Sequence, residues 1–247
     1  MKKRIFLLIH LILALCLMVS CQISDGQNDI INSCNTPSNT DGIKDEYQYK
    51  IVDNAVEIIA FKDKDSKNII IPEMIAGSPV EILGEDAFYQ CKNATSIILP
   101  QTLTTLDGSP FYRCYSLQQI IIPRNVKTIE VNPFFRCSSL EMVFVDPQND
   151  KFSSVDGVLF NKEESVLIAY PEGNKRESYT IPSSVKKLNI DSFGYHTKLR
   201  KLTIMSNVVE FPDGNMFVFP NDIVLVIESG SVAEEYVKKH SLKFEYL

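Results

Sequence analysis

The chain of 247 residues is poor in the side chains that most often perform catalysis. It has three histidines, of which only His196 and His240 lie beyond residue 20. A serine or cysteine nucleophile needs a nearby base that a third group orients, and the spacing of neither histidine offers one. The glycines are scattered and form neither G-x-x-x-x-G-K nor G-x-G-x-x-G, which argues against a phosphate-binding loop. We therefore expect no enzyme activity and no cofactor.

Metal-binding patterns are also lacking, because no C-x-x-C pair exists to hold zinc. One group of acidic and amide residues could be imagined as calcium ligands. The EF-hand spacing and its distal glutamate are missing, so ordinary use in turns is favoured for these residues. They are Asp146, Asn149, Asp150 and Asp156.

Basic residues are outnumbered and do not cluster, and the formal net charge is −6. A protein that binds nucleic acid neutralises phosphates with Lys and Arg concentrated on one face. We therefore expect no nucleic-acid partner.

The first twenty residues indicate export. The basic segment Met1–Arg4 precedes an apolar run over 5–19, which is too short to be a comfortable membrane span. The run ends at Met-Val-Ser-Cys21, which resembles a bacterial lipobox with Met18 in place of the usual Leu. This resemblance implies cleavage before Cys21 and a diacylglycerol on its sulfur, and two acyl chains suffice for stable anchoring. The alternative is an ordinary secretory signal that is cut nearby.

Residues 21–46 follow the predicted signal peptide of residues 1–20. They are rich in Ser, Asn, Asp, Gln and Gly, and they bury too little apolar surface to offset the entropy of ordering. We expect a flexible tether that begins at the lipidated cysteine and contains a free thiol at Cys34. The predicted location is the bacterial cell envelope, lipid-anchored and facing outside the cytoplasm.

Beyond the tether the sequence repeats itself. Three blocks of the form Phe-x-x-Cys recur every 23 residues, at Phe88–Cys91, Phe111–Cys114 and Phe134–Cys137. A fourth block, Phe193–His196, has His in place of Cys. The period predicts stacked structural repeats, because one such unit cannot bury its apolar side alone.

Each unit also contains a short apolar run, usually ended by proline, and a turn with two apolar anchors such as Val126 and Ile129. Proline cannot donate to a β-ladder, so each run reads as one short strand. Stacking would place these strands in a parallel sheet above the aligned Phe and Cys side chains. We expect the three repeat cysteines to be buried free thiols; a disulfide between neighbouring turns is the minor alternative. The runs are Ile69–Pro72, Ile97–Pro100, Ile120–Pro123, Val143–Val145 and Tyr179–Pro182.

This pattern resembles the BspA-like leucine-rich repeats of bacterial surface proteins and some eukaryotic parasites. The family's L-x-x-I-x-I-P-x-x-V-x-x-I-x-x-x-A-F-x-x-C is matched by Leu117, Ile120, Ile122, Pro123, Val126, Ile129, Phe134 and Cys137. Ala94 departs from the repeat Leu, and Pro110 and Pro133 depart from the Ala before Phe. The fold implied is a β-rich leucine-rich-repeat solenoid with a parallel sheet over residues 47–247.

Two regions break the period. Residues 146–178 contain two apolar runs, Val158–Phe160 and Val166–Ala169, which read as an inserted β-hairpin. At the end of the chain, Ser231 and Glu234 form a capping box for a short helix, and a last strand follows. We expect this C-terminal cap, about residues 229–247, to close the core of the final repeat.

The strands also predict an exposed face. Leu117, Ile120 and Ile122 face the core. Alternate residues of a strand point to opposite faces, so Gln119 and Ile121 face outward. An exposed apolar stripe usually marks a partner. The alternatives are that the hairpin covers the stripe, or that β-branched residues simply suit parallel strands. The stripe consists of Ile70, Ile98, Gln119, Ile121, Met142 and Phe144.

The leading hypothesis is a lipid-anchored surface protein that binds a protein or glycan outside the cell. Adhesion is what the family resemblance implies, by analogy of fold rather than from a site. The alternative is a structural or assembly lipoprotein of an envelope or polysaccharide-uptake complex.

Overall fold

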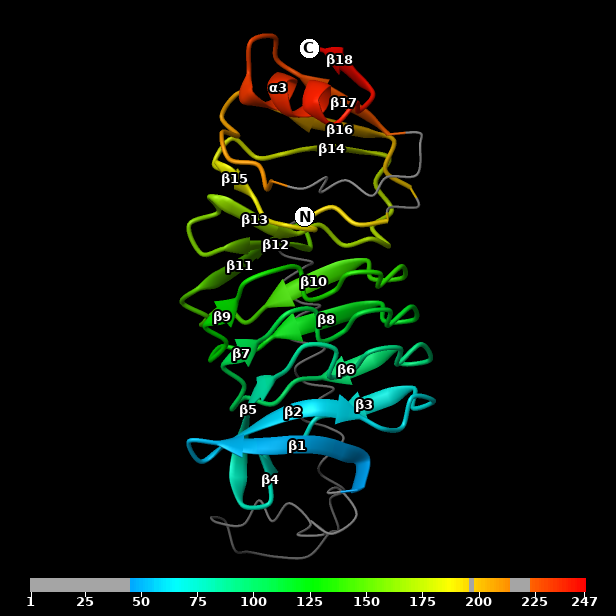
Figure 1. The fold of residues 1–247 in the computed structure, drawn as a ribbon, viewed down its shortest axis with the longest axis vertical. Coiled ribbons are helices and arrows are strands. Elements are labelled where there is room, and N and C mark those ends of the chain that lie inside the picture. The colour runs from blue at the N-terminus through cyan, green and yellow to red at the C-terminus, as the bar shows by residue number, and fades with distance from the viewer. Residues whose placement is uncertain (1–44, 196–197, 214–222) are drawn as a thin grey trace, which may run out of the picture. The chain divides into compact units, whose positions relative to one another are not determined.

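A computed structural model describes residues 45–195, 198–213 and 223–247 (Figure 1). All of them belong to one compact unit. The signal peptide, Cys21, Cys34 and His196 lie outside the described residues, so the predictions made for them stay predictions.

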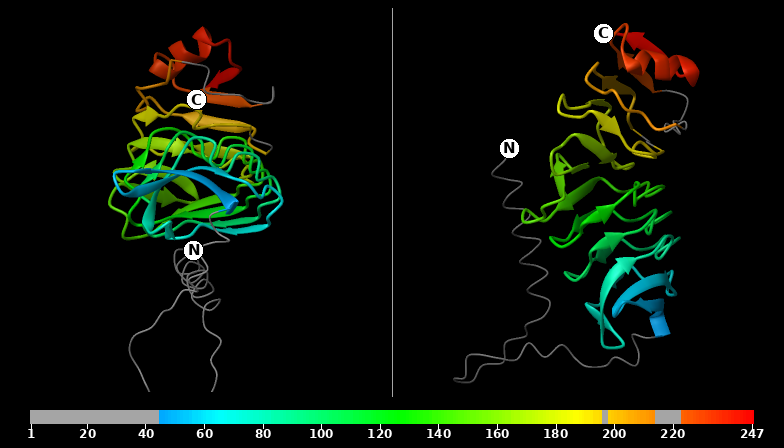
Figure 2. Two further views of the ribbon diagram at one scale, coloured as in Figure 1. Left: turned by 60° about the horizontal axis from the view of Figure 1, so that its bottom comes forward. Right: turned by 60° about the vertical axis from the view of Figure 1, so that its left-hand side comes forward.

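The proline-ended runs form short parallel strands on one side of the repeats, as predicted. Strand β3 pairs with β6, β8 pairs with β10, and β14, β16, β17 and β18 form one parallel sheet. Figure 2 shows the strands of successive turns lying one beside the next. Their bounds are β3 (Asn68–Ile70), β6 (Ser96–Ile98), β8 (Gln119–Ile122), β10 (Met142–Val145), β14 (Ser178–Thr180), β16 (Lys201–Ile204), β17 (Val224–Ile227) and β18 (Phe244–Tyr246).

A second sheet runs along the repeats, partly through segments that the sequence indicated only as turns. Its strand pairs are parallel except toward the N-terminal end, where two pairs are antiparallel. Leu83, Leu106 and Ile129 lie in register on strands β5, β7 and β9, and all three are buried. The apolar anchors of each turn are therefore also strand residues. The sheet contains β1 (Tyr47–Val52), β2 (Ala55–Phe61), β4 (Met74–Ile75), β5 (Ser78–Leu83), β7 (Thr105–Leu106) and β9 (Thr128–Ile129).

The Phe-x-x-Cys blocks form tight turns that stack on one another. The rings of Phe88, Phe111 and Phe134 lie 5.7 and 5.6 Å apart between centroids and are buried. The three cysteines are buried free thiols, as predicted. The Cys114 thiol donates to the Phe88 carbonyl at 3.2 Å, and the Cys137 thiol repeats the contact with Phe111 at 3.1 Å.

The insertion forms a layer within the stack. The predicted hairpin is present as β12 (Val158–Asn161) and β13 (Val166–Ala169), and a third antiparallel strand, β11 (Phe152–Val155), precedes it. Leu159 and Ile168 belong to the hydrophobic core on one side of this layer. Phe160 and its neighbours Val158 and Leu167 belong to the core on the other side. Strand β13 then continues in parallel with β15 (Lys187–Leu188).

The chain ends in the predicted cap. Helix α3 (Val232–Lys239) begins at Ser231, whose hydroxyl accepts the Glu234 N–H at 3.3 Å. The Glu234 carboxylate accepts the Gly230 N–H at 2.6 Å, so it caps one residue earlier than a standard capping box. Ala233, Tyr236 and Val237 are buried, and β18 pairs with β17 beside the helix.

Candidate binding surface

The stripe predicted from the alternation lies on the outward face of β3, β6, β8 and β10. Ile70 and Ile98 are 64% and 37% exposed, whereas the residues before them, Ile69 and Ile97, are 3% and 4% exposed. Met142 is 43% exposed and Gln119 is also exposed. The last two stripe residues, Ile121 and Phe144, are half-buried.

Strand register brings the stripe residues together in pairs. Ile70 lies opposite Ile98 on β3 and β6. On β8 and β10, Gln119 lies opposite Met142, and Ile121 lies opposite Phe144. Opposed side chains on neighbouring strands are within contact distance of one another. The six residues therefore form adjoining uncharged pairs on four consecutive strands.

The insertion borders the stripe at one end. Its turn places the Gly157 carbonyl 2.9 Å from the Val143 N–H, and a Cβ at Gly157 would lie 3.0 Å from the Met142 side chain. Beyond the insertion the outward positions on β14 and β16 are Thr180 and Thr203, which lie in register. The apolar character of this face thus ends where the insertion begins.

Two of the four residues considered as calcium ligands, Asp146 and Asn149, have structural roles. Asn149 is buried, and its amide donates to the carbonyls of Pro123 and Val126 at 2.8 and 3.0 Å. Asp146 accepts the Gln148 N–H at 2.8 Å within a turn. Among the described residues, no group of His, Cys, Asp or Glu is arranged to hold a metal ion.

The structure also contains a partly exposed row of aromatic side chains that was not predicted from the sequence. Tyr89, Tyr112 and Phe135, each next to a core Phe, stack at 5.4 and 5.8 Å between centroids. Arg113 lies 5.0 Å from the Tyr112 ring centre. The ring faces between neighbours in this row cover one another and so are not free to receive a ligand. The signal was the aromatic residue that follows the core Phe in three successive blocks.

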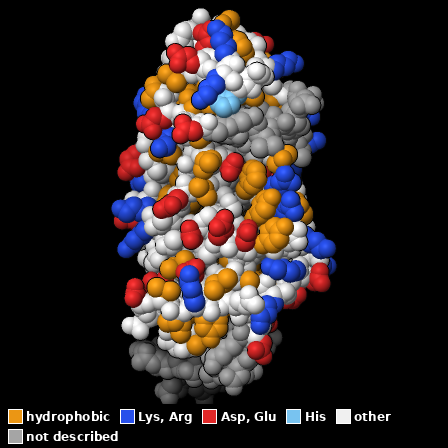
Figure 3. Space-filling model, viewed as in Figure 1, with side chains coloured by type: hydrophobic (Ala, Val, Ile, Leu, Met, Phe, Trp, Pro, Cys, Tyr) orange, Lys and Arg blue, Asp and Glu red, His pale blue; other side chains and the backbone are white. Residues whose placement is uncertain are grey.

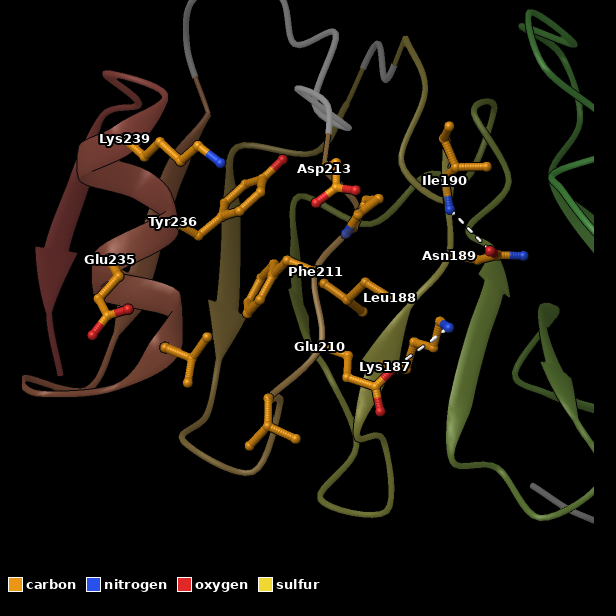
Figure 4. Close-up of a pocket in the computed structure, with 13 residues that line it drawn as sticks. Lys187, Leu188, Asn189, Ile190, Glu210, Phe211, Asp213, Glu235, Tyr236 and Lys239 are labelled. Carbon is orange, nitrogen blue, oxygen red and sulfur yellow. Dashed lines mark hydrogen bonds and ion pairs between the residues drawn. The ribbon is translucent and has the colours of Figure 1, made fainter.

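One cleft of about 660 Å³ opens beside helix α3 (Figure 4). Phe211 and Tyr236 stack within it at 4.7 Å, and Lys187 forms an ion pair with Glu210 at 3.5 Å. The residues that line the cleft come from three segments that are distant in sequence, so the repeat pattern of the sequence does not predict it. Its charges have both signs and mark no particular ligand.

The face drawn in Figure 3 mixes hydrophobic patches with both acidic and basic side chains. Lys and Arg do not gather there into one patch. Across 45–195, 198–213 and 223–247, no helix combines the length and the hydropathy that crossing a membrane requires.

Solved structures of bacterial leucine-rich-repeat proteins resemble the chain. A leucine-rich repeat protein from Eubacterium ventriosum is 21% identical with a TM-score of 0.45, over 71% of this chain and 62% of its own. The T. pallidum leucine-rich repeat protein is 19% identical with a TM-score of 0.48, over 85% and 97%. A leucine rich cell surface protein from Faecalibacterium prausnitzii is 14% identical with a TM-score of 0.35, over 74% of each.

None of the curated proteins compared with the chain matches it in sequence. The sequence profile of the BspA type leucine rich repeat region matches six copies, over residues 54–175 and 169–218. The match covers the strands from β2 to β16, whereas β1, β17 and β18 lie outside it. On these grounds the chain belongs to the BspA-type leucine-rich repeat family.

Proposed function

We propose that this protein binds a protein ligand outside the cell through the outward face of β3, β6, β8 and β10. The observation that carries the proposal is the pairing of Ile70 with Ile98 in register, with both side chains exposed. A contiguous exposed apolar surface on a soluble domain usually marks an interaction site. Membership of a repeat family with protein-interaction surfaces supports the same function.

The composition of the stripe favours a protein over a glycan. It consists of aliphatic side chains, one Met, one Gln and one half-buried Phe, and none of the six is charged. Such surfaces match the cores of protein–protein interfaces, where charged residues are depleted and Met and aromatic residues are enriched. In the separate row of Tyr89, Tyr112 and Phe135, stacking at 5.4 and 5.8 Å covers the ring faces between neighbours, which leaves mainly ring edges for a sugar to contact.

The proposal includes a lipid anchor at Cys21 on the cell envelope, with a tether carrying the repeats. Its support is the basic start, the apolar run and the Ser20-Cys21 junction of the sequence. Mass spectrometry of the mature N-terminus tests it. Cys21 with a diacylglycerol is the expected start, and an unmodified start at any other residue contradicts the anchor. No catalytic role is proposed.

Pull-down from intact cells identifies the ligand, and single variants then locate its site. Ile70→Lys and Met142→Lys should each weaken binding by about 1 kcal/mol or more, roughly fivefold in Kd, if the stripe is an interface hot spot. Ile51→Lys is the matched control, because Ile51 on β1 is 50% exposed and lies outside both the stripe and the cleft beside α3. All three variants should keep the wild-type unfolding midpoint.

The outcomes separate the alternatives. Folded stripe variants with unchanged binding would place the site elsewhere and reject the stripe. A glycan as the captured ligand would reject the protein-ligand proposal. Capture of an envelope protein as the dominant partner would favour the assembly role over adhesion.

A further inference from the structure

The stacked turns share one backbone contact that the insertion interrupts. In each Phe-x-x-Cys block the residue before Cys has a positive φ, 58° at Gln90, 63° at Arg113 and 61° at Arg136. The Gln90 N–H donates to the Tyr112 carbonyl at 3.0 Å, and the Arg113 N–H donates to the Phe135 carbonyl at 3.2 Å. Arg136 is the equivalent residue of the third block. The turn that follows it in the array, residues 193–195, lies beyond the insertion, so a backbone acceptor of the following turn is not available in the same way.

A side chain of the insertion supplies the missing acceptor. The Glu172 Oε1 atom accepts the Arg136 N–H at 2.8 Å. The carboxyl thus occupies the place that a backbone carbonyl of the following turn has in the earlier repeats.

Gly194 makes room for this carboxyl. It stands in its block where Tyr112 and Phe135 stand in theirs, directly after the core Phe. A Cβ at position 194 would lie 2.0 Å from Glu172 Oε1, which is an impossible approach. The Glu172 carboxyl can therefore occupy this place only because residue 194 has no side chain.

Asn132 makes a second contact between the turns 134–137 and 193–195. We call this set of contacts, made by Asn132, Arg136, Glu172 and Gly194, the joint. Its amide donates to the Asp191 carbonyl at 2.8 Å, and its Oδ1 accepts the Phe134 N–H at 2.9 Å. In the two preceding repeats, carbonyls of the following turn accept the equivalent N–H groups of Phe88 and Phe111. Two buried side chains thus replace two backbone contacts where the array is interrupted.

The Glu172 carboxyl is poorly compensated as an anion. The residue is 2% exposed, and its Oε2 has no hydrogen-bond partner within the described part of the chain. Burial raises its pKa from the usual 4.5 to about 7. The Arg136 and Tyr195 backbone N–H groups and the Arg136 charge act in the opposite direction, while Asp191 adds to the increase. The Arg136 guanidinium is itself engaged with Tyr195, donating to its hydroxyl at 2.7 Å.

We propose that Glu172 is a proton-dependent joint between the repeats that precede the insertion and those that follow it. The neutral carboxyl suits the buried site and accepts the Arg136 N–H. When the proton is lost, the carboxylate accepts the Arg136 N–H more strongly, but this gain and the Arg136 charge do not offset the cost of burying the charge, so the packed arrangement of the two turns is destabilised. This inference does not depend on the proposed ligand.

The direction of the pH effect follows from proton linkage. A folded-state pKa of about 7 against 4.5 means that the folded protein binds this proton about 300-fold more tightly than the unfolded chain. The associated stability is fully present below about pH 4.5 and is lost as the pH rises through 7. Between pH 5 and pH 8 the folding equilibrium constant should fall by roughly 70-fold from this group alone.

The direct test is the titration of the Glu172 carboxyl carbon by NMR in the wild-type mature protein. A midpoint near 7 is expected, and a midpoint near the usual value of 4.5 would overturn the proposal. This measurement needs no variant, so it decides the matter even if substitutions at Glu172 prevent folding.

The second test compares unfolding of wild type, Glu172→Gln and Glu177→Gln between pH 5 and pH 8. Glu172→Gln should lose most of the decline with pH, whereas Glu177→Gln, an exposed carboxylate in the same insertion, should follow the wild type. Asp191, whose pKa burial also raises, is present in all three proteins and so contributes to each. Equal pH dependence in wild type and Glu172→Gln would reject the joint.

Discussion

At the residue scale, the buried ring stack shows how one side chain serves two repeats. Phe111 is fully buried, and its ring lies 5.7 Å from Phe88 and 5.6 Å from Phe134. Phe111→Ala should therefore destabilise the protein by about 3–5 kcal/mol, since it removes contacts in two neighbouring turns. Denaturant unfolding measures this loss. Tyr115→Ala, at a 39% exposed site in the same turn, should cost far less, and a similar cost for both would contradict the stacked core.

Gly194 offers a second residue-scale prediction, because its need for glycine arises from one neighbour. Gly194→Ala should be strongly destabilising in the wild type, where the new Cβ meets Glu172 Oε1 at 2.0 Å. In a Glu172→Ala background the same substitution should cost much less. A double-mutant cycle of unfolding free energies measures this coupling. Additive costs would mean that another contact excludes a side chain at position 194.

At the scale of elements, strand alternation predicts opposite results for adjacent residues of β3. Ile69 is 3% exposed and Ile70 is 64% exposed. Ile69→Lys should unfold the domain because it buries an unpaired charge, whereas Ile70→Lys should fold with little change in midpoint. Circular dichroism during thermal unfolding distinguishes them. Unfolding of Ile70→Lys would mean that this face is covered in the protein.

The elements also show where sequence reasoning succeeds and fails. The proline-ended strands and the Phe-x-x-Cys turns could be predicted because identical residues recur at a fixed period. Strands β7 and β9 could not, since two residues each carry no alternation to recognise. Strand β11 has two serines at its centre and resembles a turn in composition.

The candidate site was predictable to the same extent. Alternation placed Ile70, Ile98, Gln119 and Met142 on the exposed face, but it could not foresee that Ile121 and Phe144 are half-buried, which depends on neighbouring chain segments. The Glu172 joint could not be predicted from the repeat pattern. Its carboxyl takes the place of a backbone carbonyl at one point of the array only, so no recurring residue marks it.

At the scale of the whole repeat domain, the insertion divides the hydrophobic interior into two cores. Residues from Tyr47 to Phe152 pack in the first core, and residues from Ile181 to Val237 pack in the second. Strands β12 and β13 contribute to both, so they are the layer through which the two cores meet. Because each repeat contacts mainly its neighbours, stability should be transmitted along the array from turn to turn.

This division predicts a graded response to a substitution far from the insertion. Leu202 is fully buried in the second core, on β16. Leu202→Ala should cost about 2–5 kcal/mol and should accelerate hydrogen exchange most in β16, β17 and β18. The effect should be smaller in β12 and β13 and smallest in β2 and β5, because sub-global opening involves contiguous units before the whole domain. Exchange followed by mass spectrometry on the intact mature protein, with Phe111→Ala as the mirror variant in the first core, measures the gradient. Uniform acceleration over all strands in both variants would show instead that the two cores unfold as one cooperative unit.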